Sequence, residues 1–230
     1  MKTLVIVSHP DIQDSGSQKY LKDSLPTSDN VIYHHLESEY PDGQIDITKE
    51  QHLLAEAHRI ILQFPFYWYA APAVMKQWMD EVLTEGFAHG PKGTALRGKE
   101  LGLVMVVGVA EKEYQVGGAE GFTISTLTTP FQALAKKLGM TFMKPLAIHQ
   151  FQYMEEIEKM RLLVTYQQYL TMANTDSLRA KEAWFLDHLE AFTQVGLPEN
   201  GAFILEQITE KIEDTRMELD EIQMYLDGLF

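Results

Sequence analysis

The chain has 230 residues, 45 per cent of them hydrophobic, which is enough to bury the core of one α/β domain together with an appendage. Its 19 basic and 33 acidic residues leave a formal charge of −14, and a field of this sign opposes binding to nucleic acid or to anionic membrane surfaces. The absence of cysteine excludes disulfides, thiolate metal sites, iron–sulfur clusters and a cysteine nucleophile, so redox chemistry would require a bound cofactor.

Short apolar runs in the first third of the chain predict buried β-strands separated by helices. The runs are Leu4 to Val7, Val31 to Tyr33 and Arg59 to Phe64. A helix is expected from Ser17 to Pro26, and capping-box spacing that starts at Thr48 predicts another through Ala57. The opening apolar run is too short for a signal-peptide core and no run has the length of a membrane span, so we expect a cytoplasmic protein without membrane insertion.

The middle of the chain continues the alternation. Pro72 is placed to begin a helix, and Leu101 to Val107 is the most strand-like run of the chain. A helix from Ile124 to Leu138, ended by Gly139, precedes a fifth strand between Thr141 and His149.

Strands that alternate with crossover helices predict an α/β fold with a doubly wound, five-stranded parallel sheet. Ligands bind such sheets at the carboxyl ends of the strands, near the point where the strand order reverses. We therefore expect the chemistry in the loops that follow Val7, Phe64 and Val107.

Beyond about Tyr153 the pattern changes to long helices, expected at Glu155 to Met172, Leu178 to Val195 and Phe203 to Gly228. In the last helix, apolar residues at three- and four-residue spacing form a narrow seam with Thr215 as its only polar interruption: Leu205, Ile208, Ile212, Leu219, Ile222, Leu226 and Leu229. The seam packs either against the preceding helix of the same chain or against another subunit.

The first loop, Ser8 to Gln18, has the composition of an anion site. It joins the N–H groups of a helix start to the hydroxyls of Ser15 and Ser17 and the imidazole of His9. It matches neither the glycine-rich dinucleotide fingerprint nor a Walker loop. The alternative is that Ser17 only caps its helix and that His9 is a solvated turn residue.

The second loop carries four successive aromatic residues, Phe66 to Tyr69, between Pro65 and Pro72. These side chains cannot all enter one core, so some of them must be exposed. Exposed rings on a stiff backbone make a platform for a planar ligand, whose edge the N–H groups of the loop can meet. The alternative, compatible with the first, is a patch at a subunit interface.

The segment QFPFYWYAAPAVMKQWMDEVLTEGFAHG, Gln63 to Gly90, closely resembles the corresponding segment of the flavodoxin-like NAD(P)H:quinone oxidoreductases. That family includes DT-diaphorase, the bacterial modulator-of-drug-activity reductases and the ancillary quinone reductases of glutathione-gated potassium efflux systems. The resemblance extends from Leu4 to about His149. It implies a flavodoxin-like flavin-binding domain, residues 1–175, and leaves residues 176–230 as a C-terminal helical extension packed on that domain or at a dimer interface.

The resemblance also implies a set of flavin-binding positions. The residues that would hold the flavin phosphate are His9, Ser15, Ser17 and Gln18. Those that would cradle the isoalloxazine ring are Pro65, Phe66, Tyr67, Trp68 and Tyr69. A loop from Gly108 to Tyr114 would close over the ring. The flavin would be FMN, with FAD as the alternative, and family members act as homodimers with each active site at the subunit boundary.

Two departures from the family pattern bear on the chemistry. Where many relatives have Thr-Thr-Gly-Gly after the fourth strand, this chain has Val106, Val107, Gly108 and Val109, so two hydroxyls that could contact the ring edge are missing. The tyrosine and histidine proposed to steady the reduced flavin in relatives correspond to Tyr114 and Glu120. A carboxylate cannot donate a proton unless it is itself protonated.

The implied activity is that of an NAD(P)H dehydrogenase (quinone), a ping-pong transfer of hydride from NADPH or NADH through the flavin to a quinone-like acceptor. Tyr114 is the candidate hydrogen-bond donor to the flavin. Two alternatives stay open: a flavin-binding ancillary subunit that docks on a partner protein, and a nitro- or azo-reductase. A metal site is the least favoured, because His34 and His35 are adjacent and would point to opposite faces of a strand.

Overall fold

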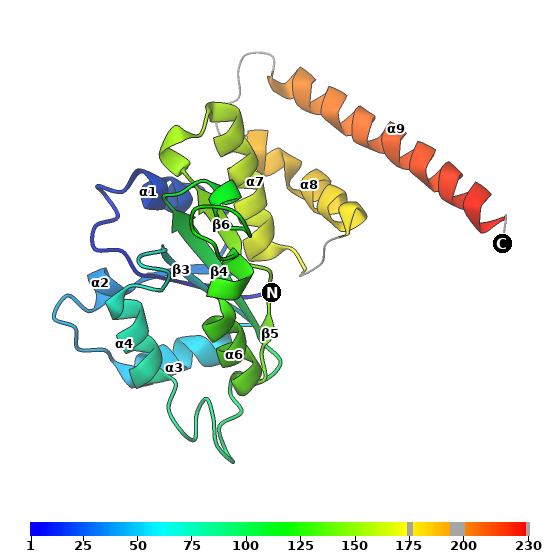
Figure 1. The fold of residues 1–230 in the computed structure, drawn as a ribbon. Coiled ribbons are helices and arrows are strands. Elements are labelled where there is room, and N and C mark those ends of the chain that lie inside the picture. Colours follow the sequence, from blue (N-terminus) through cyan, green and yellow to red (C-terminus); the bar gives the residue numbers. More distant parts are fainter. Residues whose placement is uncertain (174–176, 194–200, 229–230) are drawn as a thin grey trace. The chain divides into compact units, whose positions relative to one another are not determined.

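The computed structural model describes residues 1–173, 177–193 and 201–228 of the chain. They belong to two compact units, Met1–Thr171 and Met172–Phe230, each defined by its own internal contacts. Figure 1 shows the first unit as a central sheet surrounded by helices and the second as helices alone.

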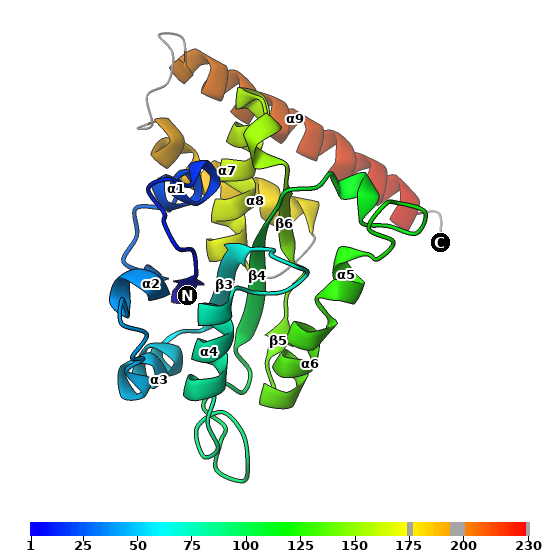
Figure 2. The ribbon, with the colours of Figure 1, turned by 60° about the vertical axis from the view of Figure 1, so that its left-hand side comes forward.

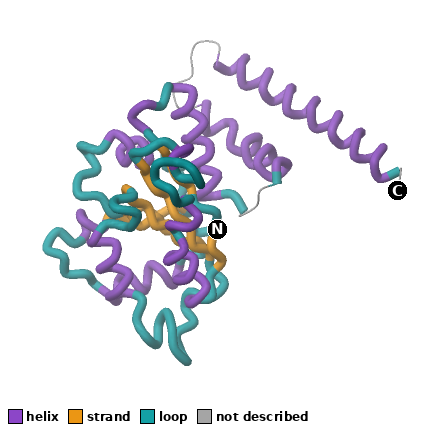
Figure 3. Tube along the Cα trace, in the orientation of Figure 1, coloured by secondary structure: helices purple, strands orange, loops and turns teal. Residues whose placement is uncertain are grey.

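The first unit is built on a parallel sheet in the order β2-β1-β3-β4-β5, and a sixth strand, β6, also pairs with β4. In chain order the strands are β1 (Thr3–Val7), β2 (Val31–His35), β3 (Arg59–Pro65), β4 (Glu100–Val107), β5 (Thr141–Phe142) and β6 (Leu146–His149). All five pairings are parallel, and the strands lie at the centre of the unit in Figure 3. The predicted flavodoxin-like sheet is confirmed, with one strand more than expected.

The additional strand arises because the predicted fifth strand is interrupted. The N–H of Met143 still donates to the carbonyl of Leu101 at 2.8 Å, after which Lys144 and Pro145 leave the ladder. Proline has no N–H to donate, so pairing with β4 resumes only at Leu146.

Helices cover both faces of the sheet, as expected for a doubly wound fold (Figure 2). The helices and 3-10 turns of the first unit are α1 (Gly16–Asp23), α2 (Leu36–Glu39), α3 (Ile47–Glu56), α4 (Ala73–Val82), η1 (Glu111–Glu113), α5 (Ile124–Leu127), α6 (Thr129–Leu138), η2 (Phe151–Tyr153) and α7 (Glu156–Thr171). Side chains of β1 alternate between two cores. Leu4 and Ile6 pack with residues of α3, α4 and α6, whereas Val5 and Val7 pack with residues of α1 and α7.

Helix boundaries differ from the prediction at several points. Ser15, rather than Ser17, caps α1, and Asp46, rather than Thr48, caps α3 by accepting from the N–H of Lys49 at 3.0 Å. The helix predicted from Ile124 to Leu138 is broken at Thr128, where Pro130 in the first turn of α6 has no N–H to donate to the carbonyl four residues before it. The predicted stop of α6 is confirmed: Gly139 has a φ of +69°, the left-handed conformation of a helix C-cap.

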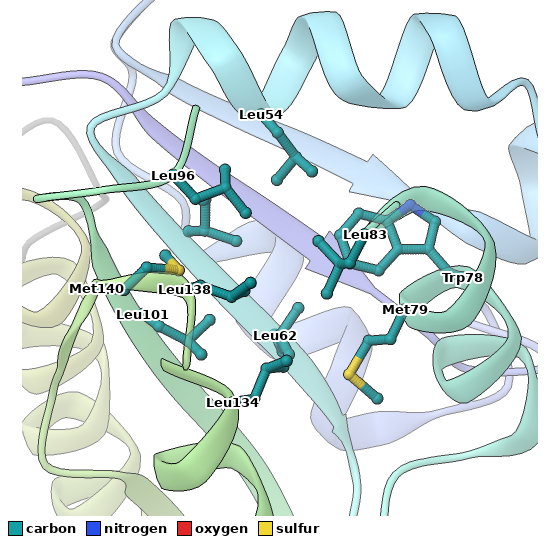
Figure 4. A pocket seen from close by; sticks show the side chains of 11 residues that line it. Leu54, Leu62, Trp78, Met79, Leu83, Leu96, Leu101, Leu134, Leu138 and Met140 are labelled. Atoms are coloured by element: carbon teal, nitrogen blue, oxygen red, sulfur yellow. The ribbon is translucent and has the colours of Figure 1, made fainter. Parts of the chain in front are cut away.

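The core on the α4 and α6 side of the sheet contains a cavity of about 20 Å³ (Figure 4). Leucine and methionine side chains make up most of its lining, and the indole N–H of Trp78 is already donated to Glu50 at 2.8 Å. A cavity of this size without free polar partners does not hold a ligand. The functional site must therefore lie elsewhere.

The second unit contains α8 (Leu178–Thr193) and α9 (Gly201–Asp227), and an ion pair joins Glu182 of α8 to Arg216 of α9. The predicted continuation of α8 to Val195 and the seam residue Leu229 lie outside the described residues. In the part of the chain that the structure describes, no helix is both long enough and apolar enough to cross a membrane.

Candidate functional site

Three loops meet at the carboxyl edge of the sheet, because β1, β3 and β4 are parallel neighbours. They are the first loop (residues 8–15), the aromatic loop (residues 66–72) and the closing loop (residues 108–123). The N–H of Ser8 donates to Gln63 at 3.0 Å and the N–H of Phe66 donates to Val106 at 2.9 Å. Since β2 and β3 lie on opposite sides of β1, the strand order reverses here, which is where open α/β sheets bind ligands.

His9 is held in the first loop with one ring nitrogen free to donate. Its Nδ1 accepts the N–H of Asp11 at 3.1 Å, so in the neutral ring the proton is on Nε2. Burial lowers the pKa of His9, which favours this neutral form. The hydroxyl oxygens of Ser15 and Ser17 lie 3.3 Å apart at the start of α1. The side chains predicted to donate to an anion therefore come from the first loop and the first turn of α1.

A half-buried pair, His35 and Glu37, fixes the path of the first loop. His35, at the end of β2, donates from Nε2 to the carbonyl of His9 at 2.7 Å, and Glu37 accepts from the hydroxyl of Ser8 at 2.6 Å. Burial opposes ionisation of His35, but the hydrogen bond and charge of Glu37 outweigh it and raise the pKa of the imidazole. These side chains had no role in the sequence prediction, because their approach depends on β2 lying next to β1.

Gln18 differs from its predicted neighbours, since its side chain points away from the loop. Its Oε1 accepts from Gln63 at 2.8 Å, and Gln63 in turn accepts from the hydroxyl of Tyr166 at 2.7 Å. All three side chains are fully buried. Only the backbone of Gln18 faces the first loop, and its N–H already donates to the hydroxyl of Ser15 at 3.2 Å.

The aromatic loop turns back on itself through two residues in the left-handed conformation. Trp68 and Tyr69 have φ values of 47° and 63°, and the N–H of Ala70 donates to Tyr67 at 3.0 Å, which makes a type I′ turn. Asparagine and glycine usually occupy such positions because bulky side chains are strained there. As predicted, some of the four aromatic side chains are exposed and others are not: Phe66 is buried and Trp68 is 91 per cent exposed.

The closing loop places Tyr114 against the last strand of the sheet. Its ring lies 5.7 Å from that of His149, whose Nδ1 donates to the carbonyl of Val109 at 2.9 Å. Burial raises the pKa of Tyr114, and the charge of Glu120 adds to this, so the phenol keeps its proton. In the sequence His149 is an isolated histidine; its position at the carboxyl end of β6 is the signal that could have marked it.

Glu120 joins the closing loop to the aromatic loop. Its Oε2 accepts from the hydroxyl of Tyr69 at 2.7 Å, and this hydrogen bond and charge raise the pKa of Tyr69. The N–H of Glu120 also donates to Glu113, whose carboxylate accepts from Ala119 at 2.9 Å. The tertiary structure therefore brings Tyr69, Tyr114 and Glu120 together from two loops that are separate in sequence.

The remaining predicted positions lie on β4 and just after it. Val107 is buried in the core, and the carbonyl of Val106 accepts the N–H of Phe66. Gly108 and Val109 begin the closing loop, and Val109 is partly exposed. Gly108 and Val109 are exposed, whereas Val106 is half-buried.

A groove of about 520 Å³ borders the aromatic loop between α4 and the pair α5 and α6. Tyr69 contributes to its wall, and the rest is mainly apolar, including Met79, Leu83, Leu127, Phe131 and Leu134. The site therefore continues onto an apolar surface outside the sheet edge.

The histidines of β2 are engaged in separate contacts. His34 bonds to Glu50 at 2.8 Å on one face of the sheet, whereas His35 contacts the first loop on the other, as their adjacency predicts. No three histidine, aspartate or glutamate side chains among the described residues converge to hold a metal ion.

Comparison with known proteins identifies the family. The family model described as flavodoxin-like fold matches residues 1–170. The chain is 48% identical over 143 residues to the "Uncharacterized NAD(P)H oxidoreductase YrkL" of Bacillus subtilis, covering 62% of this chain and 82% of that protein.

Two solved structures are similar over most of the same region. The NADPH-quinone reductase from P. pentosaceus has 47% identity and a TM-score of 0.70, with 74% of this chain and 98% of that chain covered. General stress protein 14 from Treponema denticola, solved in complex with FMN, has 34% identity and a TM-score of 0.67, with 74% and 96% covered. The predicted family is thus confirmed, and this chain belongs to the flavodoxin-like NAD(P)H:quinone oxidoreductases.

Proposed function

We propose that this protein binds FMN at the carboxyl edge of the sheet and transfers two electrons, as hydride, from NADPH or NADH to a quinone-like acceptor. The transfer would be ping-pong, with both substrates using one pocket in turn. FMN is preferred to FAD because the Treponema denticola relative was solved with FMN bound. Cytoplasm, where reduced nicotinamide nucleotides are available, is the proposed location.

The left-handed turn at Trp68 and Tyr69 carries this proposal. Two bulky residues in such a turn cost folding free energy, and strain of this kind is kept where a site needs it. The N–H groups of Phe66, Tyr67 and Ala70 donate to carbonyls of the protein, which leaves those of Trp68 and Tyr69 for a ligand edge. The turn also leaves the Trp68 ring exposed as a flat apolar surface. A planar ring system with a polar edge fits that combination.

The first loop fits the phosphate end of the same ligand. The hydroxyls of Ser15 and Ser17 and the Nε2–H of His9 would donate to phosphate oxygens, joined by the N–H groups that open α1. The positive end of the helix dipole adds a local attraction that the acidic protein as a whole lacks. The Gln18 side chain has no part in this contact.

The polar end of the site is formed by Tyr114, with Tyr69 and Glu120 beside it. Bound flavin would supply the hydride chemistry, and the chain would supply position and hydrogen bonds. Tyr114 keeps its proton and is the donor available to an electron-rich ring edge. Glu120 holds Tyr69 and closes the mouth of the site, but its carboxylate does not replace the proton donor that relatives carry at this position.

A homodimer is part of the proposal. The groove between α4 and the pair α5 and α6 is apolar, borders Tyr69 and would be covered by a second subunit, which would then complete the acceptor pocket. Family resemblance supports this arrangement, and apolar surface of this extent favours burial.

The test is an anaerobic absorption experiment. The purified chain is mixed with FMN or FAD, freed of unbound flavin, and then treated with NADPH or NADH followed by a benzoquinone. Retained flavin that bleaches with the nicotinamide and recovers with the quinone is the expected result. Absence of retained flavin would refute the proposal and make the aromatic loop a subunit interface.

The same experiment separates the competing functions. Retained flavin that does not bleach would indicate an ancillary flavin-binding subunit, and would point to Glu120 and to the missing hydroxyls at Val106 and Val107. Bleached flavin that is reoxidised by nitro or azo compounds but not by quinones would indicate a nitro- or azo-reductase.

A further inference from the structure

The apolar seam of α9 follows a strict heptad. With Leu205 at position a, the a positions are Leu205, Ile212, Leu219 and Leu226, and the d positions are Ile208, Thr215, Ile222 and Leu229. Alternating steps of three and four residues are maintained across the helix without a shift. A strict a and d pattern is the narrow seam of a coiled coil rather than the wider stripe of a helix on a globular core.

Four described residues of this seam are exposed, whereas Ile212 and Thr215 in its middle are half-buried. Ile208, Leu219, Ile222 and Leu226 are 37, 40, 55 and 47 per cent exposed, whereas leucines of the sheet cores have almost no exposed surface. Arg216 contacts Glu182 of α8, but it occupies position e beside the seam rather than a or d. The ion pair lies beside the half-buried middle of the seam, and the exposed residues on either side of it remain available.

We infer that α9 pairs with α9 of a second copy of this chain as an antiparallel coiled coil. The register places Ile208 against the partner's Leu219 and Ile212 against the partner's Thr215. In this register Leu205, Ile212 and Leu219 meet the partner's Ile222, Thr215 and Ile208, Leu226 lies opposite the partner's Gly201, and Thr215 lies next to the twofold axis. The interaction joins two copies through the C-terminal unit, independently of the flavin site.

Charges beside the seam select the antiparallel direction. In parallel helices, position g faces position e of the next heptad, so Lys211 would face the partner's Arg216 and repel it. In antiparallel helices g faces g, and this register brings Lys211 opposite the partner's Glu218. The twofold axis makes two such pairs of opposite charge.

The same charges select the register. A shift of one heptad that places Ile208 against the partner's Leu226 brings Glu218 opposite the partner's Glu218. It also brings Arg216 opposite the partner's Arg216. The opposite shift, which places Ile208 against the partner's Ile212, brings Lys211 opposite the partner's Lys211. Only the central register avoids facing like charges, which destabilise such contacts.

The chain has no cysteine, so introduced cysteines report the geometry without interference. In the full-length double variant Ile208→Cys/Leu219→Cys, the two cysteines of one copy face those of the other at disulfide distance, and mild oxidation should give a covalent dimer. Each single variant should stay uncrosslinked, since its cysteines lie about 16 Å apart along the paired helices. Met224→Cys, exposed at the outer position f, is the matched control and should also stay uncrosslinked.

A charge change provides the second test. Adding Glu218→Lys to the double cysteine variant should lower the rate of dimer crosslinking on the order of tenfold, and adding Lys211→Glu as well should restore it. Crosslinking of the single variants would indicate a parallel pair and overturn the inference. Absence of crosslinking in the double variant would also overturn the inference, whatever the result of the flavin experiment.

Discussion

Replacing Trp68 by glycine should stabilise the flavin-free protein relative to replacing it by alanine, although both changes remove the same ring. A residue with a Cβ costs about 1–2 kcal/mol in the left-handed conformation that Trp68 adopts. Glycine relieves that strain but loses roughly 0.4–1 kcal/mol through the greater freedom of the unfolded chain. Because Trp68 is 91 per cent exposed, little burial is lost in either variant. The glycine variant should therefore be more stable than the alanine variant by about 0.5–1 kcal/mol.

The assay is equilibrium urea unfolding of both variants without flavin, followed by circular dichroism, together with fluorescence titration by FMN. Both variants should bind FMN more weakly than the parent, by roughly tenfold, because the exposed ring is gone. A glycine variant that is less stable than the alanine variant would show that the turn is not strained. Unchanged FMN binding would remove Trp68 from the proposed site.

Glu120→Gln should lower the pKa of Tyr69 towards its ordinary value of 10.0, because the hydrogen bond and charge of the carboxylate raise it; ultraviolet titration against a Tyr69→Phe control measures this. Glu50→Gln should destabilise the fold by on the order of 2–3 kcal/mol at neutral pH. Burial raises the pKa of Glu50, but hydrogen bonds led by that from His34 outweigh it, so the pKa in the folded state lies below its ordinary value of 4.5. The ionised carboxylate therefore stabilises the fold above pH 4.5, and this stabilisation is lost as the pH falls through the pKa of the folded state. The difference from the parent should shrink in acid, and a constant difference in unfolding midpoints would contradict this. Glu37→Gln should lower the pKa of His35, measured by a nuclear magnetic resonance titration. Because the pKa of His35 is raised in the folded protein, protonated His35 stabilises the fold below pH 6.5, and this stabilisation disappears as the pH rises through the pKa of the folded state.

Local sequence pattern was sufficient for the scaffold. Buried parallel strands are continuous apolar runs, so β1, β3 and β4 are visible in the sequence without any knowledge of their neighbours. Gly139 ends α6 through its own backbone freedom, which is also a local property. Where two local signals competed, the prediction failed: Ser15 and Asp46, rather than Ser17 and Thr48, accept the first helical N–H groups.

The sequence by itself predicted the loops in which we propose the chemistry and showed which residue types stand in them, because strand ends and loop composition are visible in short-range patterns. Only the tertiary structure decided which side chains of those loops face the site. Gln18 turns into the core because Gln63 of the adjacent strand bonds to it, and Tyr69 reaches Glu120 across fifty-one positions of sequence. His149 meets Tyr114 only because β6 lies beside β4. These contacts depend on how separate strands are placed side by side, and no local spacing encodes that placement.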